Sequence, residues 1–208
     1  MLLPSAYLPP VWYFAQLCAC DGHTAQVECC DHYAGQTYRN RCYIAGADGP
    51  LSLTIPVVKG TETKTLMRDV RISDHGHWHR QHWNALTTAY ASSPFFLYYE
   101  DDFRPFYEHP CRFLYDFNLA LTELCCHLID LHPQLLPTTA YTSAGARDDW
   151  RECIRPGGEA AMNTACTCVP YWQVSAHRLG FLPGLSIVDL LFNMGPESIF
   201  VLQKSINA

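Results

Sequence analysis

The clearest pattern of apolar and polar positions lies in the middle of the chain, after Pro110. Apolar residues recur there at intervals of three or four positions: Phe113, Phe117, Leu121, Leu124, Leu128 and Leu131. This period places the six side chains on one side of an α-helix, so it predicts a helix that packs against a core. A second helix is expected from Trp78 to Ala91. A third begins with a capping box, in which Ser186 stands three positions before Asp189, and ends at Gly195-Pro196.

Strict alternation of residue types predicts a strand in the N-terminal third of the chain. Every second position is apolar, at Leu51, Leu53, Ile55 and Val57, with Ser52, Thr54 and Pro56 between them. Such alternation indicates a strand with one buried face. The turn-forming residues 46–50 separate it from a strand expected over 38–45, so we expect a β-hairpin. Shorter strands are expected over 1–3, 25–30 and 70–72, and a helix begins near Pro9 or Pro10.

These elements together predict an α/β or α+β fold. A mixed β-sheet containing the hairpin occupies the N-terminal third, and a mostly helical C-terminal two thirds packs on it. Residues 133–170 have no sustained period, so we expect a long, mobile loop there, with one short helix near 148–154. The length of 208 residues suits one domain spanning residues 1–208.

Composition and charge exclude several classes of protein. Hydrophobic residues make up 49% of the chain and charged residues 16%, and the net charge is -6, which disfavours binding to nucleic acids or anionic membranes. No apolar run reaches the roughly 18 residues that span a bilayer. Prolines interrupt the apolar N-terminus, and no Lys or Arg precedes Arg39, so no signal peptide is expected. We therefore expect a cytoplasmic protein without a membrane span, and the sequence leaves its oligomeric state open.

Eight of the eleven cysteines stand in adjacent or near-adjacent pairs, such as Cys29/Cys30 and Cys125/Cys126. This spacing is typical neither of a disulfide framework nor of the paired thiolates of a zinc site, so we interpret most of them as reduced and buried. Cys111, Cys125 and Cys153 are candidate nucleophiles, although no local signature supports them against simple burial.

Two arginines are the strongest candidates for binding a ligand. Arg39 and Arg41 flank Asn40 where a polar loop enters the expected strand, and strand alternation directs both guanidinium groups to one face. Their donor geometry matches phosphate or carboxylate. The alternative is that both arginines form surface salt bridges with Glu28 or Asp31.

A histidine-rich run offers a candidate general base or metal site. His75, His79 and His82 follow one another at helical spacings of four and three, which allows them to share a face and bind a metal. Histidines scattered over a helix surface are more common, so we expect no metal site. His75 stands beside Asp74, and a carboxylate can orient an imidazole and raise its basicity. This pair is the candidate for proton transfer.

The aromatic run from Pro94 to Tyr107 admits two interpretations. It can stack a base or a sugar ring, but such runs more often belong to the core, and we favour the core. Hydrolase elbows, dinucleotide fingerprints and Gly-Lys-Ser phosphate loops are absent from the sequence. The sequence therefore predicts no cofactor.

Several segments, in this order and spacing, resemble the WbqC-like protein family. They are Tyr7-Leu8-Pro9, Tyr13-Phe14, Tyr38-Arg39-Asn40-Arg41, Gly49 to Pro56, Ile72 to His75, Gly180 to Pro183 and Leu185 to Asn193. Members of this family occur in bacterial O-antigen gene clusters. The resemblance implies an aminoacyl (glycine) or acyl transferase that acts on a nucleotide-linked or surface-polysaccharide sugar.

The resemblance also implies roles for individual residues. Arg39 and Arg41 hold the pyrophosphate of a nucleotide sugar, and His75 with Asp74 deprotonates an amino group that attacks an acyl donor. The remaining expected substrate-binding residues are Tyr7, Gln36, Tyr38 and Asn40. Similar sequences usually carry a lysine where this chain has Gly35, which puts catalysis in doubt. A non-catalytic binding protein for nucleotide sugars and a histidine-ligated, metal-dependent hydrolase are the alternatives.

Overall fold

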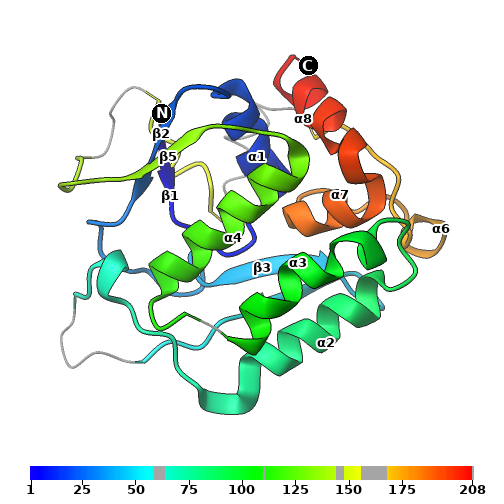
Figure 1. Cartoon of the computed structure of the whole chain (residues 1–208), viewed down its shortest axis with the longest axis horizontal. Coiled ribbons are helices and arrows are strands. Elements are labelled where there is room, and N and C mark those ends of the chain that lie inside the picture. The colour runs from blue at the N-terminus through cyan, green and yellow to red at the C-terminus, as the bar shows by residue number, and fades with distance from the viewer. Residues whose placement is uncertain (59–63, 110, 144–147, 156–167, 208) are drawn as a thin grey trace.

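A computed structural model of the chain describes residues 1–58, 64–109, 111–143, 148–155 and 168–207 (Figure 1). It begins with a strand, β1 (Leu2–Pro4), followed by helix α1 (Val11–Ala19) and strand β2 (Thr24–Glu28). The two strands pair in parallel, and β5 (Gln134–Pro137) pairs in parallel with the other side of β2. All three strands therefore end at one edge of a small parallel sheet.

The hairpin forms a second, antiparallel sheet from β3 (Arg41–Ala45) and β4 (Pro50–Thr54). Its register places Arg41 opposite Thr54. At the turn, a Cβ on Gly46 would lie only 2.8 Å from the backbone oxygen of Gly49, so this position needs glycine. The predicted alternation of burial holds for Leu53, which is buried, whereas Leu51, beside the β3–β4 turn, is 43% exposed.

Most of the remaining chain is helical. The helices are α2 (Trp78–Tyr90), α3 (Phe96–Glu108), α4 (Leu114–Ile129), α6 (Ala176–Leu179), α7 (Ile187–Met194) and α8 (Ser198–Asn207). Short 3-10 turns occupy Met67–Asp69, His75–His77 and Gly195–Glu197. Figure 1 shows α2 and α3 side by side on one side of the hairpin, and α1, α7 and α8 together near the C-terminus. None of these described helices is long and apolar enough to cross a membrane.

The aromatic run lies in α3 and contributes to the core, as favoured from the sequence. Phe96 and Phe103 are buried and pack edge-on against Phe192 of α7, with ring centroids 5.2 and 5.4 Å away. The same helix exposes Leu97 and Tyr98. The helical period of this run therefore separates a buried face from a solvated one.

The α/β class, the hairpin and the mostly helical C-terminal region are confirmed, although the parallel and antiparallel strands form two separate sheets. The sequence missed β5, which lies inside the expected loop 133–170. The strand expected over 70–72 is wrong, since these residues form only isolated bridges. The short helix expected near 148–154 is also wrong, because those residues form turns. Residues 144–147 and 156–167 of that loop lie outside the described residues.

The capping box is half right. The Ser186 hydroxyl caps α7 by accepting a hydrogen bond from the Val188 N–H. In a complete capping box the Asp189 side chain would accept from the Ser186 N–H. Here that N–H donates to the backbone oxygen of Tyr43 in the hairpin. Asp189 instead turns inward, where it is fully buried.

Candidate functional site

The segment from Gln36 to Arg41 forms a turn that leads into β3. Gln36 is exposed and adopts a left-handed backbone with φ of 60°, while Tyr38 and Asn40 are buried. The backbone oxygen of Tyr38 accepts from the Tyr7 N–H at 2.8 Å. The Asn118 side-chain amide of α4 donates to the Arg39 backbone oxygen, also at 2.8 Å. The turn is therefore fixed to the βαβ unit and to α4 at once.

The charges of Arg39 and Arg41 both act on the Tyr33 hydroxyl. Burial raises the pKa of Tyr33 to about 12, and the two positive charges act against that increase. Arg39 forms an ion pair with Asp31 at 3.1 Å, as the salt-bridge alternative foresaw. Arg41 donates through Nε to Thr54 Oγ1 at 2.9 Å and has no carboxylate partner in the described part of the chain. Arg41 therefore has guanidinium donors left for an anion.

Glu28, the other carboxylate considered for these arginines, is buried and pairs with Arg151 instead. Arg151 donates to Glu28 Oε2 at 3.2 Å and forms a bidentate pair with Asp149, with contacts of 2.9 and 2.7 Å. Glu28 Oε1 accepts from the backbone N–H groups of Cys30 and Asp31. This cluster shapes the turn after β2 and thereby positions Asp31 beside Arg39. In open α/β sheets, ligands bind outside this same carboxyl edge of the strands.

Tyr7, another expected substrate-binding residue, is fully buried beneath the hairpin. Its hydroxyl lies 2.9 Å from His82 Nδ1 and 2.9 Å from the Tyr107 hydroxyl. Burial lowers the pKa of His82 to about 4, although the ring also hydrogen-bonds to the Thr54 backbone. The neutral ring therefore donates through Nε2 to Thr54 and accepts from Tyr7 through Nδ1. Tyr7 supports the site from below and does not face solvent.

The candidate base lies on the surface. Asp74 and His75 are exposed, and no hydrogen bond or ion pair joins their side chains. The Ser73 N–H donates to the Pro56 backbone oxygen, just beyond the Thr54 end of β4. This contact ties the Asp74–His75 turn to the end of the hairpin that carries Arg41.

The three histidines considered for a metal site do not come together. Gly76 and His77 have left-handed backbones, so α2 begins only at Trp78 and His75 lies outside it. His82 is committed to the buried contact with Tyr7. The described ranges contain no group of three His, Cys, Asp or Glu residues that could hold a metal ion. This arrangement gives no support to the metal-dependent hydrolase alternative.

The cysteines match the interpretation as reduced residues. The ten cysteines in the described part of the chain are all free thiols. Cys125 is buried, and burial raises its pKa well above the ordinary value; burial also raises the pKa of Cys111. Both groups are therefore protonated at neutral pH and poor nucleophiles.

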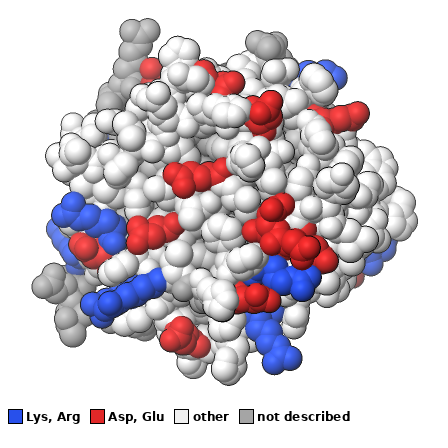
Figure 2. All heavy atoms as spheres, in the orientation of Figure 1, with Lys and Arg blue, Asp and Glu red and all other residues white. Residues whose placement is uncertain are grey.

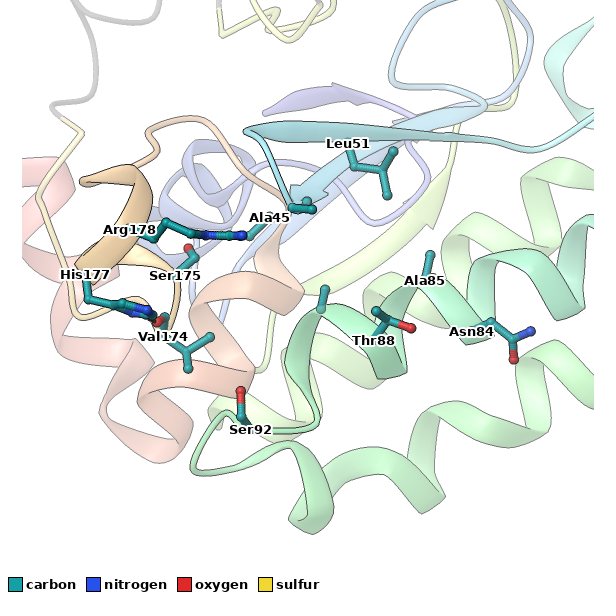
Figure 3. Close-up of a pocket in the computed structure, with 13 residues that line it drawn as sticks. Ala45, Leu51, Asn84, Ala85, Thr88, Ser92, Val174, Ser175, His177 and Arg178 are labelled. Atoms are coloured by element: carbon teal, nitrogen blue, oxygen red, sulfur yellow. Dashed lines mark hydrogen bonds between the residues drawn. The ribbon is translucent and has the colours of Figure 1, made fainter.

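A cleft of about 620 Å³, which the sequence did not reveal, opens at the other end of the hairpin (Figure 3). It lies between the β3–β4 turn, α2 and the segment 174–178. Asp189 of α7 holds one wall, since it accepts from the hydroxyls of Tyr90 and Tyr171 and from the Gln173 side-chain amide at 3.0, 2.7 and 2.8 Å. The sequence signal was the segment Leu185 to Asn193, in which Asp189 was interpreted as part of a helix cap.

Charge is distributed in small mixed groups over the face drawn in Figure 2. Most of that face is uncharged, and its acidic and basic side chains lie close to one another without an extended basic area. A phosphate backbone needs a continuous basic surface. The face drawn in Figure 2 has no such surface.

Comparison with known proteins places the chain in a family. It is 25% identical over 221 residues to an uncharacterized protein, Rv1507c, of Mycobacterium tuberculosis (strain ATCC 25618 / H37Rv), covering 95% of this chain and 94% of that protein. No solved structure matches the chain. A profile of the WbqC-like family matches residues 5–163, which are most of the 208 residues. The chain therefore belongs to the WbqC-like protein family.

Proposed function

We propose that the protein binds a nucleotide-linked sugar through the cluster of Tyr33, Arg39 and Arg41, and transfers an acyl or aminoacyl group to it. The observation that carries the proposal is a pair of arginines in one turn, both of whose charges act on Tyr33 and one of which, Arg41, keeps free donors, in a protein of net charge -6. An acidic protein repels phosphate in general, so a local pair of arginines marks the place where a pyrophosphate is stabilised.

Within this site the residues divide into ligand contacts and supports. Arg41 supplies the free guanidinium donors, whereas one edge of the Arg39 guanidinium group is paired with Asp31. Gln36 is exposed beside them and is suited to a sugar or amide group. The buried residues Tyr7, Tyr38 and Asn40 hold the turn in place. Asn40 does so by donating to the Ile55 backbone oxygen at 3.0 Å.

The proposed transfer step uses His75 as the base, with Asp74 beside it. An amino nitrogen of the sugar attacks the carbonyl carbon of the acyl donor and forms the new C–N bond. The bond from that carbon to the leaving group breaks, and the leaving group departs with its electron pair. His75 accepts the proton released by the amine.

A second candidate is a binding protein for nucleotide sugars without catalysis. The exposure of Asp74 and His75, and the lack of a hydrogen bond between them, favour it. The absence of a lysine at Gly35 points the same way. Both candidates use the same arginines, so a binding assay alone does not separate them.

Two variants test the proposal. Binding of UDP-N-acetylglucosamine is measured by calorimetry for the unaltered protein, Arg41→Gln and the control Arg80→Gln, an exposed arginine on α2. We expect Arg41→Gln to weaken binding about tenfold, the loss of one charge-assisted hydrogen bond, and Arg80→Gln to leave it unchanged. Equal binding by all three proteins overturns the site.

His75→Ala then separates catalysis from binding. Glycyl transfer to UDP-glucosamine, which carries a free amino group, is followed by mass spectrometry with an activated glycyl thioester as donor. We expect His75→Ala to bind the nucleotide sugar normally and to lose product formation. If neither protein forms product while both bind, the binding-protein candidate replaces the transferase.

A further inference from the structure

The cleft at the far end of the hairpin has the features of a second ligand site. Along β3, Ala45 at the cleft lies four residues from Arg41, a separation of roughly 13 Å at the rise of a strand. The cleft volume of about 620 Å³ falls within the range of small-molecule sites. It therefore has room for a small organic molecule that does not contact Arg41.

The floor of the cleft is apolar, and one side is polar. Ala85 and Ala89 stand one helical turn apart on α2 and face the cleft together with Leu51 of the hairpin. Asn84 and Thr88 form the adjacent row of the same helix and offer an amide and a hydroxyl. A ligand with an apolar face and hydroxyl groups would pack against the two alanines and hydrogen-bond to Asn84 and Thr88.

The opposite wall supplies positive charge. Figure 3 shows Arg178 extending from α6 toward Ala45, across the cleft from α2. In the described part of the chain, its guanidinium group has neither an ion pair nor a hydrogen bond. Asp189 forms no ion pair with it, and its carboxylate oxygens accept hydrogen bonds from Tyr90, Tyr171 and Gln173. Arg178 is therefore available to an anionic group of a ligand.

Two further polar groups lie beside this arginine. His177 Nδ1 donates to the Val174 backbone oxygen at 2.9 Å, so Nε2 is left for another partner. The hydroxyl oxygen of Ser175 is buried, lines the same cleft and has no hydrogen-bond partner among the described residues. A buried hydroxyl without a partner costs free energy, which it would recover by rotating toward an acceptor bound in the cleft.

This wall is rigidly supported. Asn193 of α7 accepts at its side-chain oxygen from the Val174 N–H at 3.0 Å and from the Ser93 hydroxyl at 3.2 Å. The side-chain amide nitrogen of Gln173 donates to Asp189 and to the Leu182 backbone oxygen, and its amide oxygen accepts from the Leu182 N–H. The charged wall is thus preformed before a ligand arrives, which lowers the entropy cost of binding.

From these observations we propose that the cleft binds a small hydroxylated organic anion. Its carboxylate or phosphate group pairs with Arg178 and accepts from Ser175, and its carbon skeleton lies against Ala85 and Ala89 of α2. Its hydroxyl groups bond to Asn84 and Thr88. Sugar acids and sugar phosphates share this chemistry. The site is independent of the arginines proposed for the nucleotide sugar.

Calorimetry with four probes tests this assignment. Glucuronate carries the carboxylate and glucose 1-phosphate carries the phosphate. Glucose has the hydroxylated ring without the anionic group, and inorganic phosphate is an anion without the ring. We expect one or both sugar anions to bind at least tenfold more tightly than glucose and than inorganic phosphate. The stronger of the two identifies the anionic group. No binding by either sugar anion, or equal binding by inorganic phosphate, overturns the proposal.

Variants locate the binding. Arg178→Gln is expected to weaken binding of the sugar anion about tenfold. Thr88→Trp, a substitution at an exposed position, is expected to block the cleft. Arg80→Gln is the charge-matched control, and Arg41→Gln separates this site from the one near Tyr33. Unchanged affinity in Arg178→Gln contradicts the site even if Thr88→Trp fails to fold. If Arg41→Gln loses binding and Arg178→Gln does not, the sugar anion binds at the site near Tyr33 and the proposal is overturned.

Discussion

The buried histidine of α2 makes the stability of the protein depend on pH. His82 is 5% exposed, and its burial lowers the pKa from 6.5 to about 4. In the unfolded chain the ring regains its ordinary pKa, so between pH 6.5 and 4 the unfolded state binds more protons than the folded state. The contribution of His82 is therefore fully present above pH 6.5, and it is lost as the pH falls toward 4.

The size of this effect follows from the shift. A difference of about 2.5 pKa units corresponds to about 3 kcal/mol of unfolding free energy between pH 7 and pH 4. Because buried carboxylates also respond to acid, the contribution of His82 is isolated by a variant. His82→Asn places an amide oxygen near the position of Nδ1 and keeps an acceptor for Tyr7, but it does not titrate.

Urea unfolding followed by circular dichroism at pH 7, 6, 5 and 4 measures the effect. At pH 7 we expect His82→Asn to be less stable by about 1 to 3 kcal/mol, since the contact with the Thr54 backbone is lost. On acidification the unaltered protein should lose about 3 kcal/mol more than the variant. Parallel pH profiles for the two proteins would refute the assignment of a neutral, buried imidazole.

Two other substitutions test the two sites. Gly35→Lys should strengthen binding of UDP-N-acetylglucosamine about three- to tenfold in calorimetry, because a Cβ at Gly35 meets nothing closer than the Tyr33 hydroxyl at 3.6 Å and the ammonium group joins the two arginines. Ala91→Lys, at the far end of α2, is the control, and an equal gain there would mean that only net charge matters. Asp189→Ala removes the acceptor of three hydrogen bonds, from Tyr90, Tyr171 and Gln173, so urea unfolding should show a loss of about 3 kcal/mol, and the cleft should lose its ligand. A loss below about 1 kcal/mol would show that this network does not hold the wall.

Periodicity was sufficient for the long elements and insufficient for the short ones. The hairpin and the helices α2 and α4 have local patterns because each buries one face. Strand β5 consists of only Gln134–Pro137, and it pairs with β2 more than a hundred residues earlier. Such a strand is determined by tertiary contacts, which a local pattern does not contain.

The candidate site was found from the sequence for a reason that is only partly right. Strand alternation suggested that Arg39 and Arg41 share a face, yet Arg39 lies in the turn before β3. Asp31 holds the Arg39 side chain and Thr54 holds that of Arg41, and both charges act on Tyr33. Tyr33 itself carries no local signal, since its role depends on a turn shaped by the buried Glu28.

The cleft could not be predicted because its walls come from separate parts of the chain. Arg178 belongs to a four-residue helix with no amphipathic period, and hydrogen bonds from α7 to the preceding segment help to place it opposite α2. The sequence did identify the Asp189 motif. Its interpretation as a capping box missed the inward turn of the carboxylate, which depends on donors from Tyr90 and Tyr171.

The proposed anion site of Tyr33, Arg39 and Arg41 is tested most directly by nuclear magnetic resonance with the nucleotide sugar. The Nε–H signal of Arg41 and the ring signals of Tyr33 are followed during titration with UDP-N-acetylglucosamine. We predict saturable shifts at both residues with one common affinity, and no shift at Arg178. Saturable shifts at Arg178 alone, or binding without any change at Arg41 and Tyr33, would contradict this account.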